Sequence, residues 1–96
     1  MYGINEKVYN NLIEYFTLNK YIKSVILFGS RAKGNERNNS DIDLCIDCVE
    51  DKRGSIEEKI DELIGIYSAD ILYLDSLNTE IKEQINKYGI IIYKRV

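Results

Sequence analysis

Two strand-like segments joined by a polar, glycine-containing stretch constrain this fold more than any other feature of the chain. Residues 24–28, "SVILF", are a continuous apolar run that ends at a glycine, as expected of a buried strand. Residues 41–47, "DIDLCID", alternate between polar and apolar side chains, as a half-buried strand does. On such a strand Ile42, Leu44 and Ile46 face one side, and Asp41, Asp43, Cys45 and Asp47 face the other.

Helical and strand patterns alternate along the rest of the chain. Ser55 and Glu58 form a capping box, a side-chain pair that starts many helices, directly after a polar turn at 51–54. Gly89 is expected to end the last helix as a C-terminal cap. Three sets of apolar residues recur at helical spacing and predict helices: Ile4, Val8, Leu12, Tyr15 and Phe16 over residues 4–19; Ile56, Ile60, Leu63, Ile64 and Tyr67; and Leu77, Ile81, Ile85 and Tyr88. Two further strands are predicted at residues 69–75 and 90–94. Strands interleaved with helices predict an α/β (α+β) fold, in which a small mixed sheet is flanked by helices.

The size and composition of the chain narrow its class. Its 96 residues favour one domain, 1–96, with a modest core. No apolar run approaches the ~20 residues that span a bilayer, and the N-terminus has no signal-peptide core, so we expect a cytoplasmic protein without a membrane partner. The net charge of −3 disfavours a nucleic-acid partner, because phosphate neutralisation supplies most of that affinity. The absence of histidine excludes histidine-based acid–base chemistry and His-ligated zinc.

Cys45 and Cys48 form a C-x-x-C motif, which occurs in redox and metal sites. A redox pair usually opens a helix, whereas these two lie in a strand pattern and, three residues apart, point to opposite faces. No second Cys or His pair completes a zinc site. We therefore expect two small buried or half-buried side chains with no disulfide between them.

Asp41 and Asp43 leave the same face of the expected strand, with backbones roughly 7 Å apart. Carboxylates placed in this way can converge on magnesium, which prefers hard oxygen ligands. Two such ions about 3.5–4 Å apart can clamp the attacking and leaving oxygens of a phosphoryl displacement.

Gly29 and Ser30 directly follow the first strand. If a short helix begins there, its free backbone N–H groups can hold phosphate, and the missing Cβ of Gly29 allows close approach. The Ser30 hydroxyl adds a hydrogen bond, and Arg31 and Lys33 add positive charge for a triphosphate. Singly, a Gly-Ser pair is an ordinary turn and a D-x-D is more often a solvated strand face, but in this order and spacing the two together are much more specific.

The segment "GSRAKGNERNNSDIDL" (29–44) resembles the signature of the DNA polymerase beta-type nucleotidyltransferase superfamily, and most closely that of its minimal nucleotidyltransferases. Their pattern is Gly-Ser, ten residues, then Asp-x-Asp, and this chain matches that spacing. The resemblance covers nearly the whole chain. A small departure is Lys33, where arginine is commoner.

The family also requires a third carboxylate on a neighbouring strand. Members carry this acid at the start of the strand expected at 69–75, which implies Asp70, whereas Asp75 is expected to end the strand. Asp47 is in phase with Asp43 but lies roughly 13 Å along the strand, too far to share a metal. A water-facing residue at a strand edge is the structural alternative for Asp70.

The resemblance implies a magnesium-dependent enzyme, similar to a protein adenylyltransferase, that transfers AMP from ATP to an acceptor hydroxyl and releases pyrophosphate. Two Mg²⁺ ions would be held by the acids of the site. The implied catalytic and metal-binding residues are Asp41, Asp43 and Asp70, and the implied nucleotide-binding residues are Gly29, Ser30 and Arg31.

Larger relatives add an acceptor-binding domain, which implies that a partner chain supplies the acceptor here. Minimal members are commonly paired with helical HEPN-type proteins, and some are antitoxins that attach AMP to a HEPN toxin. The alternative is a non-catalytic nucleotide-binding antitoxin that neutralises its partner by contact alone; the intact set of acids favours the enzyme. The acceptor, the nucleotide preference and homo-oligomer formation stay open.

Overall fold

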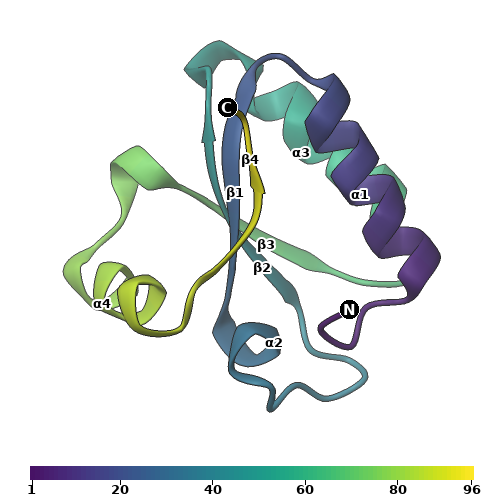
Figure 1. Ribbon diagram of the computed structural model, residues 1–96, viewed down its shortest axis with the longest axis vertical. Coiled ribbons are helices and arrows are strands. Elements are labelled where there is room, and N and C mark those ends of the chain that lie inside the picture. Colours follow the sequence, from purple (N-terminus) through teal and green to yellow (C-terminus); the bar gives the residue numbers. More distant parts are fainter.

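A four-stranded mixed sheet forms the centre of the computed structural model, which describes residues 1–96 (Figure 1). The strands are β1 (Ile22–Phe28), β2 (Ile42–Cys48), β3 (Ala69–Tyr73) and β4 (Ile90–Lys94). Their order in the sheet is β3-β2-β1-β4. β1 pairs antiparallel with both β2 and β4, and β2 pairs parallel with β3. The predicted helix-flanked mixed sheet is therefore confirmed.

Helices cover both faces of this sheet. The helices are α1 (Glu6–Leu18), α2 (Gly29–Lys33), α3 (Arg53–Ile64) and α4 (Thr79–Tyr88), with short 3₁₀ turns at Glu50–Lys52 and Leu74–Ser76. α1 and α3 lie side by side on one face, while α4 packs on the other and contacts α2 (Figure 1). None of the helices combines the length and the apolar character needed to cross a membrane.

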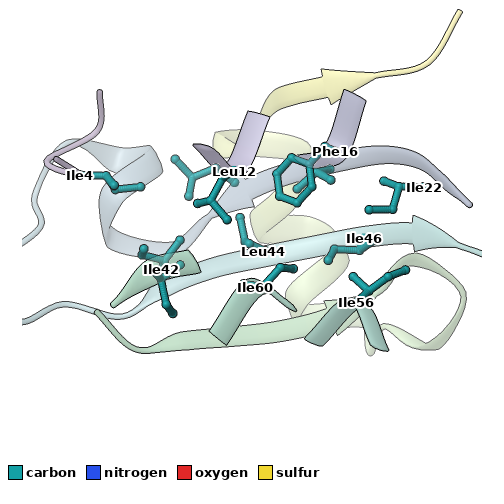
Figure 2. Close-up of a cluster of buried hydrophobic side chains, with 12 residues drawn as sticks. Ile4, Leu12, Phe16, Ile22, Ile42, Leu44, Ile46, Ile56 and Ile60 are labelled. Atoms are coloured by element: carbon teal, nitrogen blue, oxygen red, sulfur yellow. The ribbon is translucent and has the colours of Figure 1, made fainter. Parts of the chain in front are cut away.

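Two apolar clusters hold the layers together. The main cluster lies between the sheet and the α1–α3 layer, where Leu44 of β2 packs among Leu12, Phe16 and Ile60 (Figure 2). Its twelve buried members are Ile4, Leu12, Phe16, Ile22, Val25, Leu27, Ile42, Leu44, Ile46, Ile56, Ile60 and Ile64. The smaller cluster joins Phe28 and Cys45 to Ile85 of α4 on the opposite face.

The alternation predicted for the second strand is confirmed at both cysteines. Cys45 is buried in the smaller cluster, whereas Cys48 is half-buried against the main cluster. Both are free thiols. The prediction of small, unlinked residues on opposite faces of the strand is thus correct.

The predicted capping box at the start of α3 is wrong. The helix already begins at Arg53, after a 3₁₀ turn that leads directly into it, and no side chain caps its first turn. The Ser55 hydroxyl instead donates to the carbonyl of Lys52 at 3.0 Å. The helix therefore continues a turn that is already wound and needs no separate cap.

The other boundaries differ by only a few residues. α1 begins after Asn5 and α4 after Asn78, because each asparagine oxygen accepts backbone N–H groups of the first turn. β3 ends at Tyr73 because the chain then enters a 3₁₀ turn. Gly89 does cap α4, but with extended backbone, and its N–H donates to the carbonyl of Ile85.

Candidate functional site

The junction of β1 and α2 places a glycine against a carboxylate. α2 begins at Gly29, immediately after the strand, and Gly29 has a φ of +74°. A Cβ added to Gly29 would lie 2.0 Å from Oδ2 of Asp43. Both the left-handed backbone and this close approach require glycine. The predicted short helix is present, and its first residue lies directly against the Asp43 carboxylate.

The parallel pairing of β2 and β3 brings a second acid beside Asp43. Asp43 is aligned with Asp70 across β2 and β3, and with Phe28 across β1 and β2. Asp41 lies just before the first residue of β2. Asp43 is half-buried, whereas Asp41 and Asp70 are exposed. The three acids predicted for the site therefore gather at the edge where β1 ends and β2 and β3 begin.

The carboxylate of Asp43 lies in an unfavourable electrostatic environment. Burial, followed by the negative charges of Asp70 and Asp41, raises the pKa of Asp43 to about 6, and the positive charge of Arg31 opposes this rise. Placing three acids within electrostatic reach of one another costs free energy in the protein alone. Such an excess of negative charge is the environment that a bound cation would relieve.

These residues fit a divalent magnesium ion by their donor chemistry. Carboxylate oxygens are the hard ligands that magnesium prefers, and the field around Asp43 favours added positive charge. The side chains as placed do not form a group of three that closes around a metal. Because Asp41 and Asp70 are exposed, their carboxylates face solvent with room to reorient.

The predicted phosphate-binding residues differ in their exposure. Ser30 is half-buried, and its carbonyl accepts the N–H groups of Gly34 and Asn35 at the end of α2. Arg31 is only 1% exposed, and its guanidinium donates to the protein itself. Lys33 is exposed, with its ammonium 5.1 Å from the centre of the Tyr88 ring.

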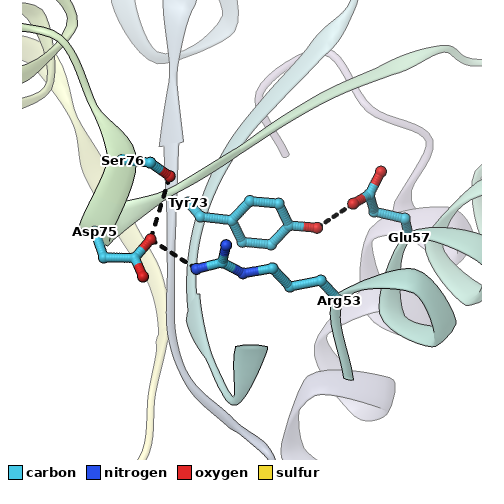
Figure 3. Close-up of polar contacts among 5 residues, drawn as sticks. All are labelled: Arg53, Glu57, Tyr73, Asp75 and Ser76. Atoms are coloured by element: carbon cyan, nitrogen blue, oxygen red, sulfur yellow. Dashed lines mark hydrogen bonds and ion pairs between the residues drawn. The ribbon is translucent and has the colours of Figure 1, made fainter. Parts of the chain in front are cut away.

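Asp75, the other acid near β3, has a different partner. It lies in the 3₁₀ turn at the far end of that strand from Asp70 and pairs with Arg53 at 2.6 Å (Figure 3). The Arg53 guanidinium also stacks 4.1 Å from the ring centre of Tyr73, whose hydroxyl donates to Glu57. This network ties α3 to the end of β3, so Asp75 has a structural role.

Sequence reasoning did not find the contacts that surround Arg31. The carbonyls of Tyr2 and Ser40 and the ring of Tyr67 all lie against its guanidinium. Two of these contacts are with backbone carbonyl oxygens, which every residue has, so no residue type in the sequence indicates them. The helical stripe predicts Tyr67 as part of the helix, whereas α3 ends at Ile64, three residues before Tyr67.

Comparison with known protein families identifies one family for most of the chain. The family model described as "Polymerase beta, Nucleotidyltransferase" matches residues 10–96. No curated protein sequence matches the chain.

Solved structures share the fold at low sequence identity. A chain of a toxin–antitoxin complex with AMP-PNP superposes with a TM-score of 0.69 and 22% identity, over 96% of this chain and 75% of that one. A tri-AMPylated Shewanella oneidensis HEPN toxin in complex with an MNT antitoxin contains a chain with a TM-score of 0.60 and 18% identity, over 92% of this chain and 71% of that one. A nucleotidyltransferase homologue from Sulfolobus solfataricus superposes with a TM-score of 0.58 and 21% identity, over 93% of this chain and 79% of that one.

Proposed function

Because this chain belongs to the polymerase beta-type nucleotidyltransferase family, we propose that it transfers AMP from ATP to a hydroxyl of a partner protein. The observation that supports this activity most directly is the placement of Asp43. Its carboxylate lies against Gly29, the glycine expected to approach phosphate, and its Cα is paired with that of Asp70 across β2 and β3. A metal-dependent phosphoryl transfer needs acids and a phosphate-binding turn in this proximity.

In the proposed reaction, the acceptor oxygen forms a bond to the α-phosphorus as the bond to the pyrophosphate oxygen breaks. Gly29 and Ser30 would bind the departing phosphates through their backbone N–H groups. Asp70, which is exposed beside Asp43, would accept the proton of the acceptor hydroxyl. Two magnesium ions held by Asp41, Asp43 and Asp70 would supply Lewis-acid activation and stabilise the leaving oxygen.

We propose a HEPN-type toxin as the acceptor, which would make this chain an antitoxin. The support is that structurally similar chains belong to toxin–antitoxin complexes, one described with AMP-PNP and one with an AMPylated HEPN toxin. Arg31 was predicted to bind phosphate together with Gly29 and Ser30. Its guanidinium is buried and donates to backbone carbonyls of the protein itself.

The Asp43→Asn variant tests this function. The neutral amide is nearly isosteric but cannot hold the metals, so AMP transfer should be lost. The assay uses radiolabelled ATP and the candidate HEPN protein, followed by mass spectrometry for an added AMP. The matched control is Asp47→Asn, on the same strand and face, which should retain transfer. If Asp43→Asn still neutralises the toxin and the toxin carries no AMP, the protein acts by contact alone.

A further inference from the structure

Arg31 is the one polar side chain buried in this structure, with 1% of its surface exposed. Its Nη1 donates to the carbonyl of Tyr2 at 3.1 Å, and its Nη2 donates to the carbonyl of Ser40 at 2.7 Å. The guanidinium also lies 5.3 Å from the ring centre of Tyr67. Three segments that are distant in sequence therefore meet on one side chain of α2.

Two of these segments lead directly into acids of the site. Ser40 immediately precedes Asp41, and Tyr67 lies three residues before Asp70. The entering segments are also joined to each other, because the N–H of Ile42 donates to the carbonyl of Ser68 at 2.8 Å. A displacement of the Arg31 guanidinium would therefore shift the backbone that leads into Asp41 and into Asp70.

The N-terminal turn closes over the same guanidinium. Gly3 has a φ of +72°, and a Cβ there would lie 2.9 Å from Nη1 of Arg31. The N–H of Asn5 donates to the Tyr67 hydroxyl at 2.9 Å, which ties the start of α1 to the segment before β3. The turn is thus fitted to the arginine and shields it from solvent.

The energetics of burial favour a structural use of this cation. Neither ion pair in the structure involves Arg31, and its Nε has no hydrogen-bond partner. A buried charge is costly unless its hydrogen bonds offset the lost hydration. A planar guanidinium can donate to two carbonyls at fixed angles, which the point charge of lysine cannot reproduce.

We propose that Arg31 is a positioning residue of the nucleotidyltransferase site. Its guanidinium fixes the segments before Asp41 and Asp70 against α2, and it does not contact the nucleotide. This role rests on the proposed function. The contacts of Arg31 with Tyr2, Ser40 and Tyr67, called the clamp below, are a property of the fold alone. The two therefore need separate measurements.

Hydrogen–deuterium exchange tests the clamp without any ligand. In Arg31→Lys and Arg31→Met, amides in residues 1–5, 38–42 and 66–70 should exchange about tenfold faster or more, because local opening loses its largest restraint. Amides of α3 should exchange at the wild-type rate. The control is Arg37→Lys, an exposed arginine in the loop between α2 and β2, which should change nothing. Wild-type exchange in all three segments of both Arg31 variants would overturn the proposal.

Kinetics then distinguishes positioning from direct phosphate contact. With the partner protein, both Arg31 variants should lower kcat for AMP transfer by about 10²-fold, as expected when reacting groups shift by about 1 Å. Calorimetry should find the ratio of ATP to AMP affinity unchanged. Direct contact with the β- and γ-phosphates would instead lower that ratio, with lysine partly restoring it, and would overturn the proposal. If the wild type transfers no AMP, the proposed function fails while the exchange result still decides the clamp.

A second variant covers the case in which the Arg31 variants do not fold. Gly3→Ala keeps the guanidinium but pushes the N-terminal turn away from it. The expected result is faster exchange in residues 38–42 and 66–70 as well as in the turn itself. Faster exchange confined to the turn would show that the arginine does not couple these segments.

Discussion

At the scale of single residues, the contact between Gly29 and Asp43 is the most restrictive feature of the site. Any other residue at position 29 would have to adopt a left-handed backbone conformation, and its Cβ would displace the Asp43 carboxylate. Gly34 is a matched control, because it has a φ of +78° with nothing within 4 Å of an added Cβ. We expect Gly29→Ala to lower the free energy of unfolding by about 1–3 kcal/mol more than Gly34→Ala does. Urea denaturation measures this difference, and equal losses would show that Asp43 moves aside freely.

The charge on Asp43 gives a second residue-scale prediction, concerning pH. Its pKa of about 6 lies above the ordinary value of 3.8, so the folded protein holds the proton more tightly than the unfolded chain. The contribution of Asp43 to stability is therefore fully present below pH ~4 and is lost as pH rises through ~6. At pH 7 the ionised Asp43 carboxylate therefore lowers the free energy of unfolding. Because solvent screens this half-exposed group, we expect the loss to be roughly 1–2 kcal/mol.

Asp43→Asn should remove this loss. In chelator at pH 7 we expect the variant to be more stable than the wild type, with a flatter stability profile between pH 4 and 6. Asp47→Asn, measured alongside, should keep the wild-type slope. A less stable Asp43→Asn protein would mean that the carboxylate makes a favourable contact in the metal-free state.

At the scale of elements, local patterns predicted the strands and helices, whereas nonlocal pairing decided the site. β4 has the predicted bounds because its apolar run lies between Gly89 and the polar end of the chain. Asp41 and Asp43 could be proposed from spacing, since both belong to one segment. The position of Asp70 depends on the parallel register of β2 and β3, which no local spacing encodes. The contacts of Arg31 could not be predicted for a related reason, because its partners are backbone carbonyls of Tyr2, 29 residues away, and Ser40, nine residues away.

The different starts of α3, which has no side-chain cap, and α4, which has one, yield an element-scale prediction. Asn78 accepts the N–H of Ile81 at 2.8 Å, so Asn78→Ala should cost about 1 kcal/mol of unfolding free energy. Ser55 satisfies no N–H group at the start of α3, and Ser55→Ala should cost within about 0.5 kcal/mol. Thermal and urea unfolding of the two variants provide the comparison. A larger loss for Ser55→Ala would restore the capping box that the structure rules out.

At the scale of the whole molecule, the two ends of the sheet differ in their electrostatics. One end is tied by the Arg53–Asp75 ion pair and its contact with Tyr73. The other end carries like charges that repel, held in place by strand pairing and by contacts around a single buried arginine. Under the proposed function, binding of a cation and a nucleotide would offset the free energy that gathering these acids costs. Ligand binding should therefore stabilise the entire protein, and this stabilisation should depend on the metal.

Thermal unfolding measures that linkage directly. At a ligand concentration about a hundred times Kd, binding to the folded state adds about 2.7 kcal/mol, which raises the Tm of a domain this size by roughly 10 °C or more. We expect this rise with ATP and magnesium together, and only a small rise with ATP in chelator, because the uncompensated acids repel the triphosphate. Asp43→Asn should lose the magnesium-dependent part, whereas Asp47→Asn should keep it. Equal shifts for ATP with and without magnesium would place nucleotide binding elsewhere on the molecule, since only the acidic end of the sheet requires the metal.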